Sequence, residues 1–397
     1  MNKLPHDSKV LPAGFALWNL GFRPFYLLAS IFSAASVLLW AAQFSGLLPH
    51  AYLADPLWHG HEMLIGYTTA VIAGFLLTAV RAWTGQPTAS GKPLLALAAL
   101  WVAGRVLVLT PWVITAAIAN SAFPIAVAVA IGIPLYRSRN TRNYFFVGLL
   151  VLIGALVLAT HLAFNGRWPV RFGLQGPELL HVQLDLVLFI MVVIAGRVIP
   201  MFTNNGIPGT GAMRQALLEK VALAGILALF AADLLQFGPR VTAIIALASA
   251  LAHGLRLALW KPWRTLAAPL VWILHAAYAW IVVHLALRAL TEFGLLGGSY
   301  AVHALTVGAI GGMTLGMMVR TARGHTGRVL LADKSELTMF LLVQAAVLVR
   351  VFCGIASPAL YLPSIEISGL LWAAAFGLYA VRYWPVLTRP RLDGKPG

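Results

Sequence analysis

Five histidines, His59, His61, His181, His275 and His303, lie inside or at the edges of long apolar stretches. Neutral imidazole ligates haem iron, copper and zinc, so histidines in such places are candidates for metal chemistry. A single hydrogen bond to a neighbouring helix can equally satisfy such a side chain. The sequence has no nucleotide-binding loop, serine triad, CxxC or HExxH pattern. Any catalysis would therefore come from a bound metal or haem.

The histidines recur at a regular distance. His181 follows His61 by 120 residues, and His303 follows His181 by 122. After both His61 and His303, glycines come at +5 and +13, an arginine at +20, and Thr-Gly at +23 and +24. The segment after His181 lacks these glycines, so the similarity of the first and third copies is the stronger one. A fixed period predicts a pseudo-threefold molecule with the three histidines at similar depth.

The composition places the chain in a membrane. Of its 397 residues 60% are hydrophobic and 10% charged, and the mean hydropathy is +0.85. The net charge of +16 does not indicate nucleic-acid binding, because Lys and Arg lie in short loops between apolar stretches. Cys353 is the only cysteine, which excludes a disulfide or a thiolate metal site within one chain.

Twelve apolar stretches have about the length that crosses a bilayer as a helix. We expect the spans at 23–47, 60–83, 93–110, 113–136, 144–165, 177–201, 216–236, 240–260, 266–289, 299–320, 337–356 and 363–384. The predicted fold is an all-α polytopic membrane protein, with residues 1–397 as one transmembrane domain. Its twelve helices would form three pseudo-symmetric groups of four, at about 23–136, 144–260 and 266–384.

The distribution of positive charge predicts the orientation. All but six of the 28 Lys and Arg residues fall in connections on one side, the exceptions being Arg105, Arg167, Arg171, Arg240, Arg288 and Arg350. The positive side faces the cytoplasm, so both termini are expected there. The helices that begin at His61, His181 and His303 then start near the outer face.

Spacing suggests which polar side chains act together. His181 and Asp185 lie four residues apart, hence on one helix face, as a pair of metal ligands or as a structural polar pair. His59 and His61 are about 200° apart around a helix, so both face one site only if His59 precedes the first turn. A membrane arginine needs an anionic partner, such as a haem propionate, unless it reaches the interface. Arg105 and Arg350 are the candidates.

Several motifs resemble one known family. They are Gly21-Phe22-Arg23-Pro24-Phe25, Trp58 to Met63, His181 to Asp185, Gly196 to Pro200, Leu274-His275, and the run from His303 to Arg328. Together they resemble the NnrS family of bacterial inner-membrane proteins, which is associated with haem, copper and the nitric oxide response. The resemblance covers nearly the whole chain. It implies that His59, His61, His181, His275 and His303 are the ligand candidates.

A more distant resemblance concerns architecture. Subunit I of the haem-copper oxidases and nitric oxide reductases also has twelve helices in three arcs, with histidine ligands on helices 2, 6 and 10. In the reductases a helix 6 carboxylate follows a metal-binding histidine by four residues, as Asp185 follows His181. Helix 7 here has no histidine pair and helix 10 has one histidine. The comparison therefore favours one haem and one further metal over a full oxidase.

The resulting hypothesis is a haem- and copper-binding protein of the bacterial inner membrane that reduces or sequesters nitric oxide with an unidentified electron donor. His303 would ligate a b-type haem, with His61 or His59 opposite and Arg350 or Arg105 near a propionate. His181, Asp185 and His275 would hold copper. The alternatives are a twelve-helix transporter whose histidines carry protons or metal, and a non-catalytic protein of metal or haem assembly.

Overall fold

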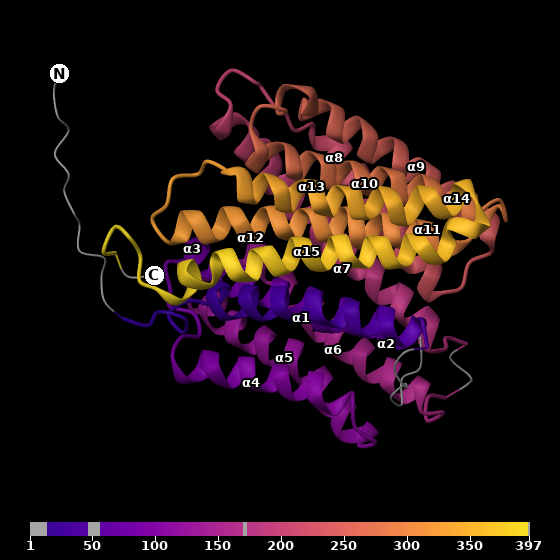
Figure 1. The fold of residues 1–397 in the computed structure, drawn as a ribbon, viewed down its shortest axis with the longest axis horizontal. Coiled ribbons are helices and arrows are strands. Elements are labelled where there is room, and N and C mark those ends of the chain that lie inside the picture. Colours follow the sequence, from indigo (N-terminus) through magenta and orange to yellow (C-terminus); the bar gives the residue numbers. More distant parts are fainter. Residues whose placement is uncertain (1–13, 47–55, 170–172, 396–397) are drawn as a thin grey trace.

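The computed structural model describes residues 14–46, 56–169 and 173–395, and within these ranges the regular structure is all helical (Figure 1). In chain order the helical segments are α1 (Phe22–Phe44), α2 (Pro56–His61), η1 (Glu62–Thr68), α3 (Thr69–Thr84), α4 (Lys92–Leu107), α5 (Val113–Arg137), η2 (Thr141–Asn143), α6 (Phe145–Phe164), α7 (Gly176–Gly206), α8 (Ala216–Leu234), α9 (Pro239–Leu259), η4 (Pro262–Arg264), α10 (Pro269–Glu292), α11 (Gly298–His303), η5 (Ala304–Gly311), α12 (Gly312–His325), α13 (Lys334–Leu348), η6 (Val349–Cys353), α14 (Gly354–Ala356), η7 (Pro358–Leu360) and α15 (Tyr361–Thr388).

Joined end to end, these segments form twelve consecutive helical rods in the described part of the chain, one for each predicted span. Ten of the rods are long and apolar enough to cross a bilayer. The other two are α4, which has 16 residues, and α8, which carries Glu219, Lys220 and Asp233. A polytopic helical fold is therefore confirmed, and ten of the twelve predicted spans have the length and composition of a membrane-crossing helix.

Two of the rods widen into π-helix directly after a histidine. The segment η1 begins at Glu62, next to His61, and η5 begins at Ala304, next to His303. A third π-helical segment, η6, contains Arg350. In α7, which follows the middle histidine, the helix stays α-helical throughout. The copy that lacks the glycine offsets is thus also the copy without the widened turn.

The helix contacts repeat once per group of four. The helices at the junctions between groups, α5 with α6, α9 with α10 and α15 with α1, all pack extensively against each other. The last of these closes the ring, and Figure 1 shows α1 and α15 side by side. This closed arrangement is what three consecutive four-helix groups require.

Glycines at matched offsets let the second helix of a group approach its first. A Cβ on Gly66 would meet Phe32 and one on Gly74 would meet Tyr26, both at 3.0 Å or less. In the third group, Gly308 stands against Trp280 and Gly316 against Leu274 in the same way. Phe32 and Trp280 are 248 residues apart, as are Tyr26 and Leu274. These matched glycines therefore serve helix packing.

Candidate functional site

The principal cavity lies at the end of the bundle away from the described termini and has a volume of about 610 Å³. Its walls are mostly apolar, and its polar lining includes His59, His181, His303 and Arg350. We call it the histidine cavity. His59 comes from α2, His181 from α7 and His303 from α11, so each group of four helices contributes one imidazole. The second helices of the three groups thus meet at this cavity, but the first group contributes His59 and not His61, the histidine of the 120-residue period.

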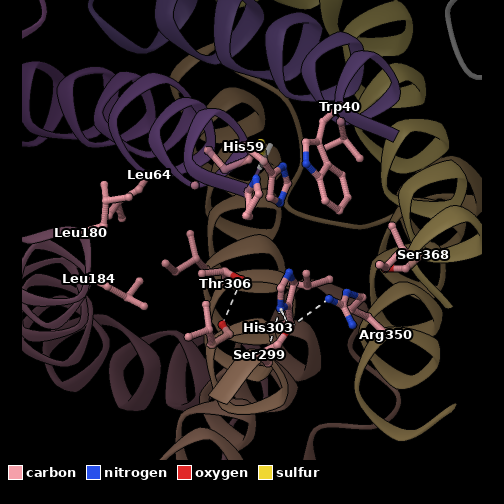
Figure 2. A pocket seen from close by; sticks show the side chains of 18 of the residues that line it. Trp40, His59, Leu64, Leu180, Leu184, Ser299, His303, Thr306, Arg350 and Ser368 are labelled. Carbon is pink, nitrogen blue, oxygen red and sulfur yellow. Dashed lines mark hydrogen bonds between the residues drawn. The ribbon is translucent and has the colours of Figure 1, made fainter. Parts of the chain in front are cut away.

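His59 and His303 face each other across the cavity (Figure 2). Their ring centroids are 6.4 Å apart and their planes differ by 9°. Imidazole nitrogens bind metals at about 2.0–2.1 Å, so this separation has room for one metal ion between the rings. Trp40 also lines the cavity and stacks on the His59 ring, with 4.2 Å between the ring centroids.

Backbone carbonyls one turn earlier orient the other two imidazoles of the cavity. Nδ1 of His303 donates to the Ser299 carbonyl at 2.7 Å, and Nδ1 of His181 donates to the Pro177 carbonyl at 3.0 Å. A carbonyl accepts only, so the proton is on Nδ1 and Nε2 keeps its lone pair. Such a second-sphere hydrogen bond is typical of metal-binding histidine. Nε2 is thus the nitrogen available to a ligand.

Arg350 supplies the positive charge of the histidine cavity. Its Nη2 donates to Ser299 Oγ at 3.0 Å, and its guanidinium lies 5.2 Å from the centre of the Tyr361 ring. The residue is only 4% exposed, and Nη1 has no hydrogen-bond partner among the described residues. A buried guanidinium nitrogen without an acceptor is costly. It fits a cavity whose ligand brings an anionic group.

His61 belongs to a separate, closed cluster. Its Nδ1 bonds Glu62 Oε1 at 2.7 Å, and its Nε2 lies 2.9 Å from Nε2 of His161. Glu62 Oε1 also accepts from Arg105 at 2.6 Å, and Arg105 in turn donates to Asn120. Both histidines are fully buried. Of the two predicted alternatives, His59 faces His303 and His61 does not. Likewise Arg350 lines the histidine cavity, whereas Arg105 already has a carboxylate.

The structure does not bring together His181, Asp185 and His275, the predicted copper ligands. His275 bonds Thr203 at 2.8 Å, and Thr203 lies 22 residues after His181 on α7, roughly 30 Å along the helix. Within the described ranges no group of three or more His, Cys, Asp or Glu side chains is arranged to hold a metal ion. This grouping is corrected: His181 lies at the cavity end of the bundle and His275 near the opposite end.

The NnrS family, described as "NnrS protein", matches residues 16–391. The chain belongs to the NnrS family. Membership covers nearly the whole chain and supports a role in the nitric oxide response. A search of curated proteins gives no match.

Some residues of this NnrS protein's two histidine sites were not predicted. His161, which meets His61 in the closed cluster, lies outside the 120-residue period. Trp40 is one of 13 tryptophans, and nothing in its spacing distinguishes it. Glu62 gave the clearest signal, since a carboxylate beside a histidine at the start of an apolar stretch requires a cation. That cation is Arg105.

Proposed function

We propose that this NnrS protein binds a haem in the histidine cavity, in the inner membrane, and uses it to handle nitric oxide. His59 and His303 would hold the iron, and Arg350 would pair with a propionate. The observation that carries the proposal is the facing pair of imidazoles, with centroids 6.4 Å apart, in an apolar cavity of about 610 Å³. Arg350 Nη1, buried without an acceptor in the described residues, independently fits the acidic edge of such a cofactor.

A bound haem would supply an iron centre for a small diatomic ligand and for one-electron chemistry. The protein's own residues do the rest. The apolar walls exclude water and admit an uncharged gas from the bilayer. His303 is fixed through Nδ1 by the Ser299 carbonyl, whereas Nδ1 of His59 has no partner among the described residues. Of the two imidazoles, His59 is therefore the one whose Nδ1 no hydrogen bond among the described residues orients.

Copper has no residues in this proposal, because the predicted ligand set is not assembled. A transporter remains the alternative from another class, and an assembly protein the third. The lining of the cavity favours a resident ligand over a transported ion: its walls are mostly apolar and its one guanidinium is deeply buried. The transporter alternative predicts purified protein without a haem absorbance band.

The test is the absorbance spectrum and haem content of the purified full-length protein and two matched variants. His303→Ala should lose most of the bound haem. His161→Ala removes an equally buried imidazole from the closed cluster and should keep it. Equal haem content and unchanged spectra in wild type and His303→Ala would refute the assignment. Size-exclusion profiles must show that both variants are folded.

Orientation can be tested separately from the cofactor. The distribution of positive charge predicts cytoplasmic termini, and the histidine cavity would then open toward the outer half of the membrane. Reporter fusions at Gly46, where α1 has just ended, and at Gly397 should report opposite sides of the membrane. Reporters on the same side would contradict both the topology and the position of the cavity.

A further inference from the structure

A second cavity of about 300 Å³ adjoins the histidine cavity. It lies between the start of α7, the ends of α8 and α10, and the start of α11. We call it the acidic cavity, after its carboxylates. Its titratable lining residues are Glu178, His181, Asp185, Asp233, His284, Arg288 and Glu292. Five of its lining residues also line the histidine cavity, namely Pro177, His181, Leu184, Gly298 and Val302.

The ion pairs of the acidic cavity leave the buried carboxyl group of Asp185 without a cation. Arg288 donates to Asp233 at 2.7 Å and to Glu292 at 2.7 Å, so its charge is already shared by two carboxylates. Asp185 is 3% exposed, and its Oδ2 has no hydrogen-bond partner in the described part of the chain. A buried carboxylate that has neither a cation nor a full set of hydrogen bonds is costly, so the carboxyl group of Asp185 is best accommodated with a proton on it.

His181 stands where the two cavities meet. Its ring is exposed to the cavity space, and Nδ1 is held by the Pro177 carbonyl at 3.0 Å. Nε2 is thus left as a base. Asp185 lies one helical turn further along the same face of α7. The other imidazole of the acidic cavity, His284, has its Nδ1 bonded to the Ala301 carbonyl at 2.8 Å and does not line the histidine cavity.

We propose that the acidic cavity is a proton route into the histidine cavity, with Asp185 as the donor and His181 as the carrier. Asp185 gives its proton to Nε2 of His181, which leaves a carboxylate beside an imidazolium. The imidazolium passes this proton to an acceptor in the histidine cavity and becomes neutral again. Asp185 then regains a proton from water through Asp233. The destination of the protons rests on the proposed function, whereas the route does not.

The test uses infrared spectroscopy of the purified full-length protein, which needs no haem. Wild type should show the C=O stretching band of a protonated carboxylic acid, and the band should shift in D₂O. Asp185→Asn should remove the band, and Asp185→Glu should restore one at a changed position. Glu366→Gln is the matched control, because Glu366 is an exposed carboxylate of α15 outside both cavities. An unchanged band in Asp185→Asn would overturn the proposal.

A second variant tests the transfer to His181. His181→Gln keeps a polar side chain but has no titratable nitrogen, so it should keep the acid band while shifting its titration. The same titration in wild type and His181→Gln would show that Asp185 does not exchange protons with His181, and the route would be rejected. Because the acid band is independent of a haem absorbance band, failure of the haem proposal and failure of the route give different results.

Discussion

The histidine cavity and the closed cluster start from matched positions in the first and third helix groups but satisfy their arginines in different ways. Arg105 and Arg350 lie on the third helix of their groups, each within electrostatic range of the matched histidine, His61 or His303. In the first group Glu62 neutralises Arg105. In the register that aligns His61 with His303, the position of Glu62 is taken by Ala304. The first group thus neutralises its arginine with its own carboxylate, whereas in the third group we expect a ligand to provide the anion for Arg350.

The largest effect is expected in the closed cluster. Glu62→Ala leaves the guanidinium of Arg105 buried without its carboxylate, and breaking a buried pair in this way costs about 3–5 kcal/mol. The free energy of unfolding should fall by that amount in denaturant titrations. Haem binding in the remaining folded protein should persist. If Glu62→Ala lowered the free energy of unfolding no more than the exposed control Glu366→Gln does, the closed cluster would not be a structural ion pair that stabilises the fold.

Ala304→Glu should give the third helix group a carboxylate at the position that Glu62 has in the first group. The new carboxylate would pair with Arg350 and lower haem affinity, on the order of a hundredfold, because a ligand must then displace a buried ion pair. Haem titration followed by absorbance measures this. Ala304→Gln adds the same volume without the charge, so it separates crowding from charge. Equal haem affinities in Ala304→Glu and Ala304→Gln would mean that the new carboxylate does not compete with the ligand for Arg350.

Arg350→Gln removes the guanidinium itself and so tests whether it pairs with a carboxylate of the ligand. Hydrogen bonds to charged groups contribute about 1.5–3 kcal/mol, so haem affinity should fall roughly tenfold to a hundredfold. The affinity for haem dimethyl ester, which lacks the free carboxylates, should hardly change. A variant that weakens the acid and the ester equally would assign Arg350 a structural role only.

The smallest effect is expected far from both sites. Asp333 caps α13 through its side chain, and hydrogen bonding with Glu336 and then Arg382 holds the pKa of its carboxyl well below its usual range. A lowered pKa stabilises the fold above the unfolded value of about 3.9, and this contribution is lost as the pH falls. Asp333→Ala should cost about 1 kcal/mol at neutral pH, measured by denaturant unfolding, with haem affinity unchanged.

The sequence was sufficient for the helices and for part of the site. Length and apolarity predicted a helix for each of the twelve rods in the described residues, and ten of these rods are long and apolar enough to span a bilayer. Matched glycines predicted the similar packing of the second helices in the first and third groups. The two-residue spacing of His59 and His61 predicted that they serve different sites. It left open which of them faces His303, because that depends on how far the helix is rotated against its neighbours.

The copper set failed for a different reason. His181 and Asp185 share a helix face, and that relation follows from spacing alone. To add His275 to this pair, one must know how deep it lies in the membrane relative to His181, on a second helix that runs in the opposite direction. His275 lies six residues into α10, near the end where Thr203 of α7 also lies, while the acidic cavity is lined by the last turns of α10. A repeat period along the chain does not tell which residues of two neighbouring helices lie at the same depth.

The widened turns after His61 and His303 make chain length itself a determinant of ligand direction. A π-turn holds one residue more than an α-turn, and one residue corresponds to about 100° of rotation. The number of residues between the histidine and the glycines that pack against the first helix therefore sets the direction in which the histidine points relative to those glycines. Removal of one residue within Ala304–Gly311 would restore an α-helix there. It would swing His303 away from His59 while every side chain of the cavity stayed in the sequence.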